Sequence, residues 1–256
     1  DYSSAASDVY KRQVSTRMSN NNYASIINYS KDDSDGYRHN TDFKTDNVFI
    51  KSSLSKKNPN TSLIATLTNR KFGANGFYAS PDATEQYEKT QTSLIGLKSL
   101  YKKGNLIIKP KLYWRRNQDE YIYIRDNPSI YRNLHKTNKI AFETNFNYFS
   151  GFGKTNFGVD ISSVSISSNN LGKHNRFITS IYVDHSFNLF NKRLNISPGF
   201  SIGYFSDLSL HSFPGIDLGF DINENIIIYG NFGKTYRIPT YTDLYYSDRT
   251  TLGNPE

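Results

Sequence analysis

The chain has 256 residues, a formal net charge of +8 and 15% aromatic residues, and it contains no Cys. The absence of cysteine excludes a disulfide framework and thiolate metal sites, and no apolar run approaches the ~20 residues of a membrane helix. Lys and Arg are scattered through turns and loops without a dense basic tract, which argues against a nucleic-acid binder. The 20 Tyr and 17 Phe, in a chain with only 36% apolar residues, favour strands over helices.

The first residues are expected to be foreign to the natural gene. The stretch "DVYKRQ" from Asp8 to Gln13 resembles the translation of a transposon adapter used in sequencing libraries; the alternative is an ordinary polar hexapeptide. Residues 1–13 are therefore left out of the fold prediction, and residues 14–256 are treated as one domain. Because the chain lacks an initiator Met and a signal peptide, we expect it to begin inside a longer protein.

Alternation of apolar and polar residues is the dominant pattern from residue 22 onward, and it predicts strands. Less regular strands are expected near 22–31, 42–55, 61–73, 88–101 and 153–167, and clearly alternating ones begin near Leu106, Ile140, Phe177, Leu194 and Pro214. The apolar parity switches near Ser163 and Val164, which predicts a β-bulge there. In total we expect about eleven strands of about ten residues, the length with which a tilted strand crosses a bilayer.

The connections between these strands alternate between short and long. The short ones are 55–60, 101–105, 150–154, 190–193 and 222–225, and the long ones are 31–41, 72–88, 116–138, 167–175, 205–213 and the closing segment. Such alternation is typical of an antiparallel up-and-down barrel of the outer membrane, with short periplasmic turns and long extracellular loops. A soluble β-sandwich is the alternative, but its strands average five to six residues.

The closing segment, "YGNFGKTYRIPTYTDLYYSDRTTLGNPE" (229–256), carries the most specific motif. Its aromatic-Arg-x-Pro box, Leu-Tyr pair and Gly-Asn-Pro element resemble, in order and spacing, the late-barrel signature of TonB-dependent outer-membrane receptors. "SDGYRHNTDF" (34–43), "FGANGFY" (72–78) and "NPSIYRNLHKTN" (127–138) resemble loops of the same family. The residues that match the closing motif are Tyr236, Arg237, Pro239, Thr240, Leu244, Tyr245, Gly253, Asn254 and Pro255.

The resemblance implies an all-β fold, a partial transmembrane β-barrel of about eleven strands out of roughly 22. It implies a monomeric receptor in the outer membrane of a Gram-negative bacterium that imports a scarce nutrient, such as a ferric siderophore or cobalamin. The implied partners are outer-membrane lipid, a plug domain of the full-length chain, absent here, and TonB, which acts through that plug. The alternative is a passive porin-like or adhesin barrel without TonB coupling. No cofactor, nucleic acid or enzymatic activity is expected.

Two groups of residues are candidates for function. In the closing motif, Pro239 ends strand pairing, and the guanidinium of Arg237 offers five donors to loop carbonyls or a carboxylate. The motif is expected to anchor a loop or to border the ligand. The candidate ligand-loop residues are Tyr78, Tyr121, Tyr123, Arg125, Tyr131 and His135.

Metal and haem sites receive weaker support. Haem receptors of this family place a His between the Arg-x-Pro box and the Asn-Pro element, and this sequence has none between Pro239 and Asn254. The carboxylates of "DDSDG" (32–36) are spaced as in a Ca²⁺ loop, but Lys31 stands at the first ligand position of the EF-hand pattern. A solvated acidic turn is the alternative for Asp32–Asp35, and no other metal site is expected.

Overall fold

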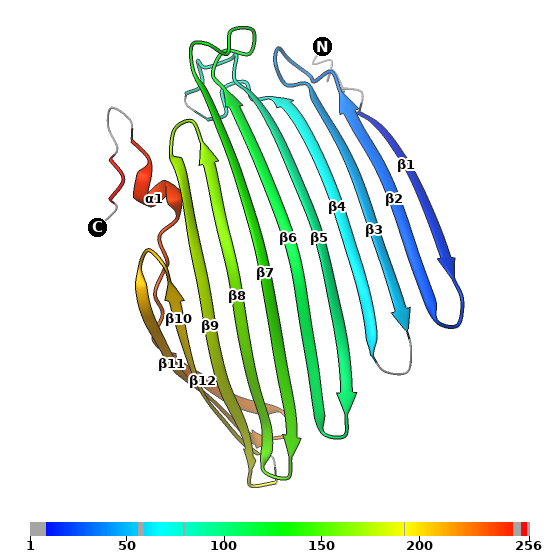
Figure 1. The fold of residues 1–256 in the computed structure, drawn as a ribbon, viewed down its shortest axis with the longest axis vertical. Coiled ribbons are helices and arrows are strands. Elements are labelled where there is room, and N and C mark those ends of the chain that lie inside the picture. Colours follow the sequence, from blue (N-terminus) through cyan, green and yellow to red (C-terminus); the bar gives the residue numbers. More distant parts are fainter. Residues whose placement is uncertain (1–8, 56–58, 79, 192, 248–251, 255–256) are drawn as a thin grey trace.

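The computed structural model is one antiparallel sheet followed by a short helix (Figure 1). It describes all residues except 1–8, 56–58, 79, 192, 248–251 and 255–256. The elements are β1 (Val9–Ser19), β2 (Tyr23–Ser34), β3 (Phe43–Ser55), β4 (Asn60–Gly73), β5 (Tyr87–Lys103), β6 (Leu106–Ile122), β7 (Arg132–Ser150), β8 (Gly153–Ser168), β9 (Gly172–Leu189), β10 (Leu194–Phe205), β11 (Ser209–Asn223), β12 (Ile226–Gly233) and α1 (Tyr241–Tyr245).

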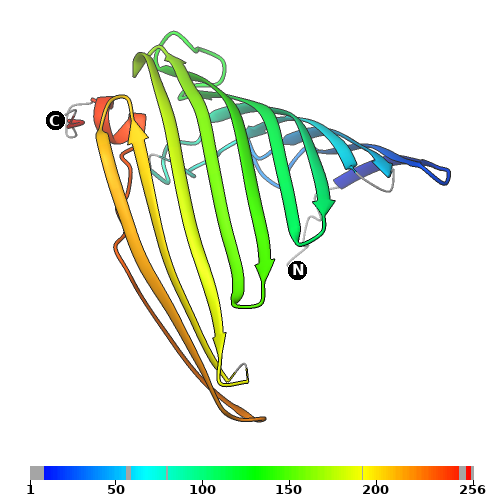
Figure 2. The same ribbon diagram turned by 60° about the horizontal axis from the view of Figure 1, so that its bottom comes forward.

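The order of the strands in the sheet is the order in the sequence, from β1 to β12. Every strand is antiparallel to its neighbours, so the predicted up-and-down topology is confirmed. The sheet curls into an open trough (Figures 1 and 2). Among the described residues β1 and β12 each pair with only one strand, which is the arrangement of a partial barrel. No helix in the described part of the chain is long and apolar enough to cross a membrane.

The described residues form twelve strands, so the prediction of about eleven is confirmed to within one strand. The additional strand is β1, which overlaps the stretch excluded from the fold prediction, and Val9–Gln13 pairs with Ser30–Ser34 of β2. The assignment of residues 1–13 as foreign to the gene stays a prediction. Genomic resequencing tests it, because finding this stretch joined in frame to Val14 would contradict it.

The predicted strands were also too short, because β5 to β9 have 16 to 19 residues each. The expected loop 116–138 is reduced to residues 123–131, and the expected loop 167–175 is reduced to residues 169–171. Both faces of these strand ends are polar. The alternation of apolar and polar residues therefore stops before the strand does, although the backbone pairing continues. The alternation of short and long connections holds up to β8 and is lost beyond it, because the expected loop 205–213 is also reduced to residues 206–208 and the connection 190–193 is longer than its two neighbours.

The bulge predicted near Ser163 and Val164 is absent. β8 stays in continuous register with β7 and β9 through both residues, and the register shift in the described ladders lies at Asp221 and Asn223, between β11 and β12. The parity switch instead reflects a second apolar surface. Val164 accepts a hydrogen bond at its carbonyl from the hydroxyl of Tyr241, so the C-terminal segment covers this part of the strand.

The two faces of the trough differ in the polarity of their side chains and in how closely these side chains approach one another. One face exposes large apolar side chains over the middle of the strands: Ile95, Leu97, Leu112, Ile140, Phe142, Ile181, Val183, Phe200 and Ile202. The other face carries polar residues that reach across strands. The hydroxyl of Tyr182 passes over Gly158 to Asn145, two strands away, and a Cβ at Gly158 would lie 2.1 Å from the Tyr182 ring. Side chains converge on a concave face, so the polar face is the inner one and the apolar face is the outer one.

Candidate functional site

A group of aromatic and polar side chains lies on the inner face where β5, β6 and the loops 74–86 and 123–131 meet. We call Tyr78, Gln86, Glu88, Tyr121 and Tyr131 the rim cluster. The ring of Tyr121 makes edge contacts with Tyr78 and with Tyr131, at centroid distances of 5.5 and 6.3 Å. The structure therefore brings together three of the six candidate ligand-loop residues, which come from two loops and one strand.

Gln86 organises this cluster, and it was missed from the sequence. Its side chain is 0% exposed, its Nε2 donates to the Tyr121 hydroxyl at 2.8 Å, and its Oε1 accepts from the backbone N–H of Tyr78 at 3.1 Å. The Tyr78 hydroxyl donates to Glu88, and burial raises the pKa of Tyr78 well above its ordinary value. A buried amide with both ends bonded fixes the rings, because leaving either end unpaired would cost free energy.

Two further groups extend the rim cluster along the inner face. Asp119 is paired in register with His135, and one of its carboxylate oxygens is buried without a hydrogen-bond partner among the described residues. His135 contacts Ser168 through Nδ1 at 2.9 Å. Tyr123 lies at the mouth of its loop, where its backbone N–H donates to the carbonyl of Tyr131 at 3.0 Å. The cluster thus presents rings, carboxylates and one imidazole.

Arg125 has a different role from the one predicted, because its guanidinium is occupied by the protein itself. It donates to both carboxylate oxygens of Asp42, at 2.5 and 2.9 Å, and to Asn40 at 3.0 Å, and it lies over the ring of Tyr87 at 4.2 Å. Its backbone N–H donates to the carbonyl of Glu85. The hydrogen bond from Arg125 holds the pKa of Asp42 below its ordinary value. Arg125 therefore ties three long loops together.

The closing motif forms a compact anchor on the inner face near the tops of β8 to β10. We call residues 236–247 and 252–254 the C-terminal anchor. Thr240 caps α1, and its side chain and that of Asp243 form a capping box. Arg237 pairs with the carboxylate of Asp243 at 3.1 Å, and Leu244 is buried. The predicted contact of Arg237 with a carboxylate is present, but the carboxylate belongs to the same turn.

Arg176 of β9 holds the C-terminal anchor to the sheet, and sequence reasoning missed it as well. Arg176 is 7% exposed, its Nε lies 2.7 and 2.9 Å from the two carboxylate oxygens of Asp207, and its Nη1 donates to the carbonyl of Pro239 at 2.9 Å. The guanidinium also lies 5.2 Å from the ring centre of Tyr241. In the sequence, Arg176 is marked only by its inward-facing position on a strand, and many other polar residues of the barrel have such a position.

Aromatic stacking and one close backbone approach complete the anchor. Tyr245 stacks on His174 with ring centres 3.6 Å apart, and Tyr236 stacks on His211 at 4.4 Å. A Cβ at Gly253 would lie 2.7 Å from the backbone of Leu244, so only glycine fits there. Asn254 donates its N–H to the carbonyl of Asp243, and Pro255 lies outside the described residues.

The acidic stretch at 32–36 does not form the loop expected from its sequence. Asp32 and Asp33 belong to β2, where consecutive side chains point to opposite faces of the sheet. The described part of the chain contains no group of three or more His, Cys, Asp and Glu side chains that could hold a metal ion.

Comparisons with known proteins agree on the fold. A model of the family described as "TonB dependent receptor-like, beta-barrel" matches residues 1–256. The siderophore receptor PirA from Pseudomonas aeruginosa is similar over 91% of this chain and 40% of its own, at 10% identity and a TM-score of 0.75. The copper transporter OprC is similar over 94% of this chain and 45% of its own, at 10% identity and a TM-score of 0.74. The ferric citrate transporter FecA, in its unliganded form, is similar over 90% of this chain and 42% of its own, at 11% identity and a TM-score of 0.66.

The chain therefore spans less than half the length of these solved proteins. No curated protein sequence matches it.

Proposed function

The chain belongs to the family of TonB-dependent receptor β-barrels, and on that premise we propose that the full-length protein imports a scarce nutrient that binds at the rim cluster. Barrels of this family lie in the outer membrane of Gram-negative bacteria, and this chain is a part of such a barrel. The proposed nutrient is a ferric siderophore or a ligand of similar size, such as cobalamin. In this proposal TonB supplies the energy through the plug domain, and no catalytic step is involved.

The observation that supports this proposal is the set of aromatic rings that are held in place yet remain exposed. Tyr131 and Tyr78 remain 41% and 47% exposed although their rings are held in place from one side. Rigid Tyr side chains offer large contact area at little entropic cost. A large ligand with both ring and polar surface fits this combination.

Replacing Tyr131 tests the site directly. In the full-length receptor, Tyr131→Ala is expected to weaken binding of the transported ligand about tenfold, in line with the loss of a central interface tyrosine. A panel of ferric siderophores and cobalamin is titrated while protein fluorescence is followed. Tyr37→Ala is the matched control, because Tyr37 is 63% exposed in a neighbouring loop and contacts only Arg38 in the described aromatic contacts.

Equal affinity of the Tyr131→Ala variant and the wild type for every ligand would contradict the proposed site. Uptake by cells provides the second measurement. Import is expected to stop when TonB is deleted, whereas unchanged uptake would favour a passive barrel.

A further inference from the structure

The outer face of β3 to β6 changes its chemistry abruptly toward the long-loop end. Its middle is apolar, with Ile50, Ala65 and Ile95 in register across neighbouring strands. Six residues further along each strand, the same parity carries Lys44 on β3, Lys71 on β4 and Lys89 on β5. Because residues of one parity share one face, these lysines lie on the outer face, directly beyond the lipid-facing band.

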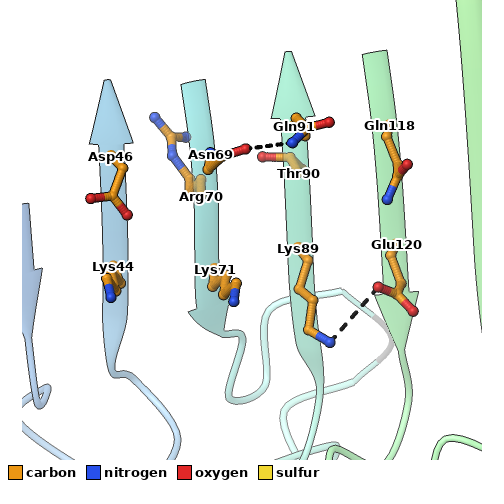
Figure 3. A pocket seen from close by; sticks show the side chains of 10 residues that line it. All are labelled: Lys44, Asp46, Asn69, Arg70, Lys71, Lys89, Thr90, Gln91, Gln118 and Glu120. Atoms are coloured by element: carbon orange, nitrogen blue, oxygen red, sulfur yellow. Dashed lines mark hydrogen bonds and ion pairs between the residues drawn. The ribbon is translucent and has the colours of Figure 1, made fainter. Parts of the chain in front are cut away.

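These side chains line a hollow of about 350 Å³ (Figure 3). Asn69, Gln91 and Gln118 occupy the next position toward the apolar band, and Gln91 donates to Asn69 at 2.8 Å. The hollow therefore has cationic groups at its outer end and amides at its inner end. We call it the outer basic pocket.

The acidic groups of the outer basic pocket are already engaged. Glu120, with a side chain that is 14% exposed, accepts from Nε of Arg132 at 2.7 Å and lies 3.8 Å from Nζ of Lys89. Asp46 accepts a hydrogen bond from the hydroxyl of Tyr29 at 2.9 Å. Among the described residues neither Lys44 nor Lys71 forms a salt bridge, so positive charge remains for an anion.

We propose that the outer basic pocket binds the phosphate of a phosphorylated glycolipid in the outer leaflet of the membrane. The pocket lies on the face that meets lipid and is continuous with the apolar band, so one molecule can place its acyl chains on Ile95 and Leu97 and its headgroup among the lysines. Basic clusters at the membrane surface attract anionic headgroups. The amides of Gln91 and Gln118 are suited to sugar hydroxyls, which donate and accept hydrogen bonds.

Removal of the three lysines tests the proposal on the full-length receptor in detergent. We expect the triple variant Lys44→Gln, Lys71→Gln, Lys89→Gln to bind a phosphorylated glycolipid about a hundredfold more weakly, since it removes three positive charges that attract the anionic headgroup. Native mass spectrometry counts the bound lipid. The dephosphorylated glycolipid is expected to bind wild type and variant equally.

The control is a triple variant with the same change in charge on the inner face: Lys51→Gln, Lys98→Gln, Lys109→Gln. Its lipid binding is expected to match the wild type, and heat-dependent mobility in electrophoresis verifies that both triple variants are folded. Equal losses in both triple variants, or no loss in the outer one, would overturn the proposal. Displacement of the lipid by inorganic phosphate at equal concentration would also overturn it, since the pocket would then be a site for the free ion. Nutrient import does not enter this experiment, so its outcome is independent of the proposed function.

Discussion

The rim cluster and the C-terminal anchor lie at the same end of the sheet and on the same face, yet they use their polar groups in opposite ways. In the anchor, the guanidinium of Arg176 donates both to the carboxylate of Asp207 and to the carbonyl of Pro239, while its Nη2 is buried without a partner among the described residues. In the rim cluster, Gln86 fixes Tyr78 and Tyr121, while Tyr78 and Tyr131 stay exposed. The comparison separates architecture from recognition: buried groups that bond within the chain hold the fold, and rings that are held in place yet stay exposed are available to a ligand.

The largest expected effect tests the orientation of the sheet, on which this comparison depends. Phe200 is 43% exposed on the apolar parity, and Ser201 lies on the opposite face. In the complete barrel, Phe200→Arg places a charge in hydrocarbon and should cost about 2–4 kcal/mol near the midplane. Ser201→Arg points into the lumen and should cost much less. A lipid-confined label attached at each position is expected to react at 200 and not at 201.

Labelling at 201 and not at 200 would mean that the sheet is oriented the other way round, with both the rim cluster and the C-terminal anchor on the lipid side of the barrel. Equal protection of the two positions would favour a soluble fold in which both faces are covered.

The second prediction concerns the C-terminal anchor. Asp207→Asn leaves the buried guanidinium of Arg176 without its counter-charge and should lower the free energy of unfolding by about 2–3 kcal/mol, somewhat less than for a fully buried pair. Ligand affinity should stay unchanged, because the anchor is not in the proposed site. Denaturant unfolding in lipid vesicles and ligand titration measure the two quantities.

Arg237→Gln is the matched control, since the Arg237 side chain is 80% exposed and solvent screens its pair with Asp243, so the free energy of unfolding should hardly change. A larger loss from Arg237→Gln than from Asp207→Asn would reverse the roles assigned to these residues. Weaker ligand binding in Asp207→Asn would remove the distinction between the two regions.

The smallest expected effect is the pH dependence of the loop clamp beneath the rim cluster. Arg125 lowers the pKa of Asp42 in the folded protein, so the clamp stabilises the fold above the ordinary pKa of a carboxyl, about 3.9, and this contribution is lost as pH falls through the lowered value. Both side chains are about one-third exposed, at 34% and 36%, so solvent screening limits the effect to less than about 1 kcal/mol. Stability of the wild type and of Asp42→Asn, followed as the pH is lowered below about 4, should converge.

A difference between wild type and Asp42→Asn that persists below that pH would assign the stabilisation to packing around Tyr87 rather than to charge.

The sequence by itself determined the topology and the family. Strict alternation around Phe200 and Ile216 requires strands with one apolar face, and short connections such as 190–193 allow only antiparallel neighbours. The closing motif from Tyr236 to Asn254 was recognisable because its spacing is local. These features depend on residues near one another in the chain, where backbone geometry sets what is possible.

Only the tertiary structure decided which polar residues act together. Arg125 and Asp42 are 83 positions apart, and Arg176 meets Pro239 across 63 positions. No local period encodes such pairs. The ends of the long strands escaped prediction for a related reason: above the membrane both faces of β6 and β7 are polar, so backbone hydrogen bonds continue where the pattern of side chains stops. The difference between the bonded anchor and the open rim cluster is therefore a property of the folded sheet. The sheet brings together residues that are far apart in the sequence, and no local pattern shows that they will be neighbours.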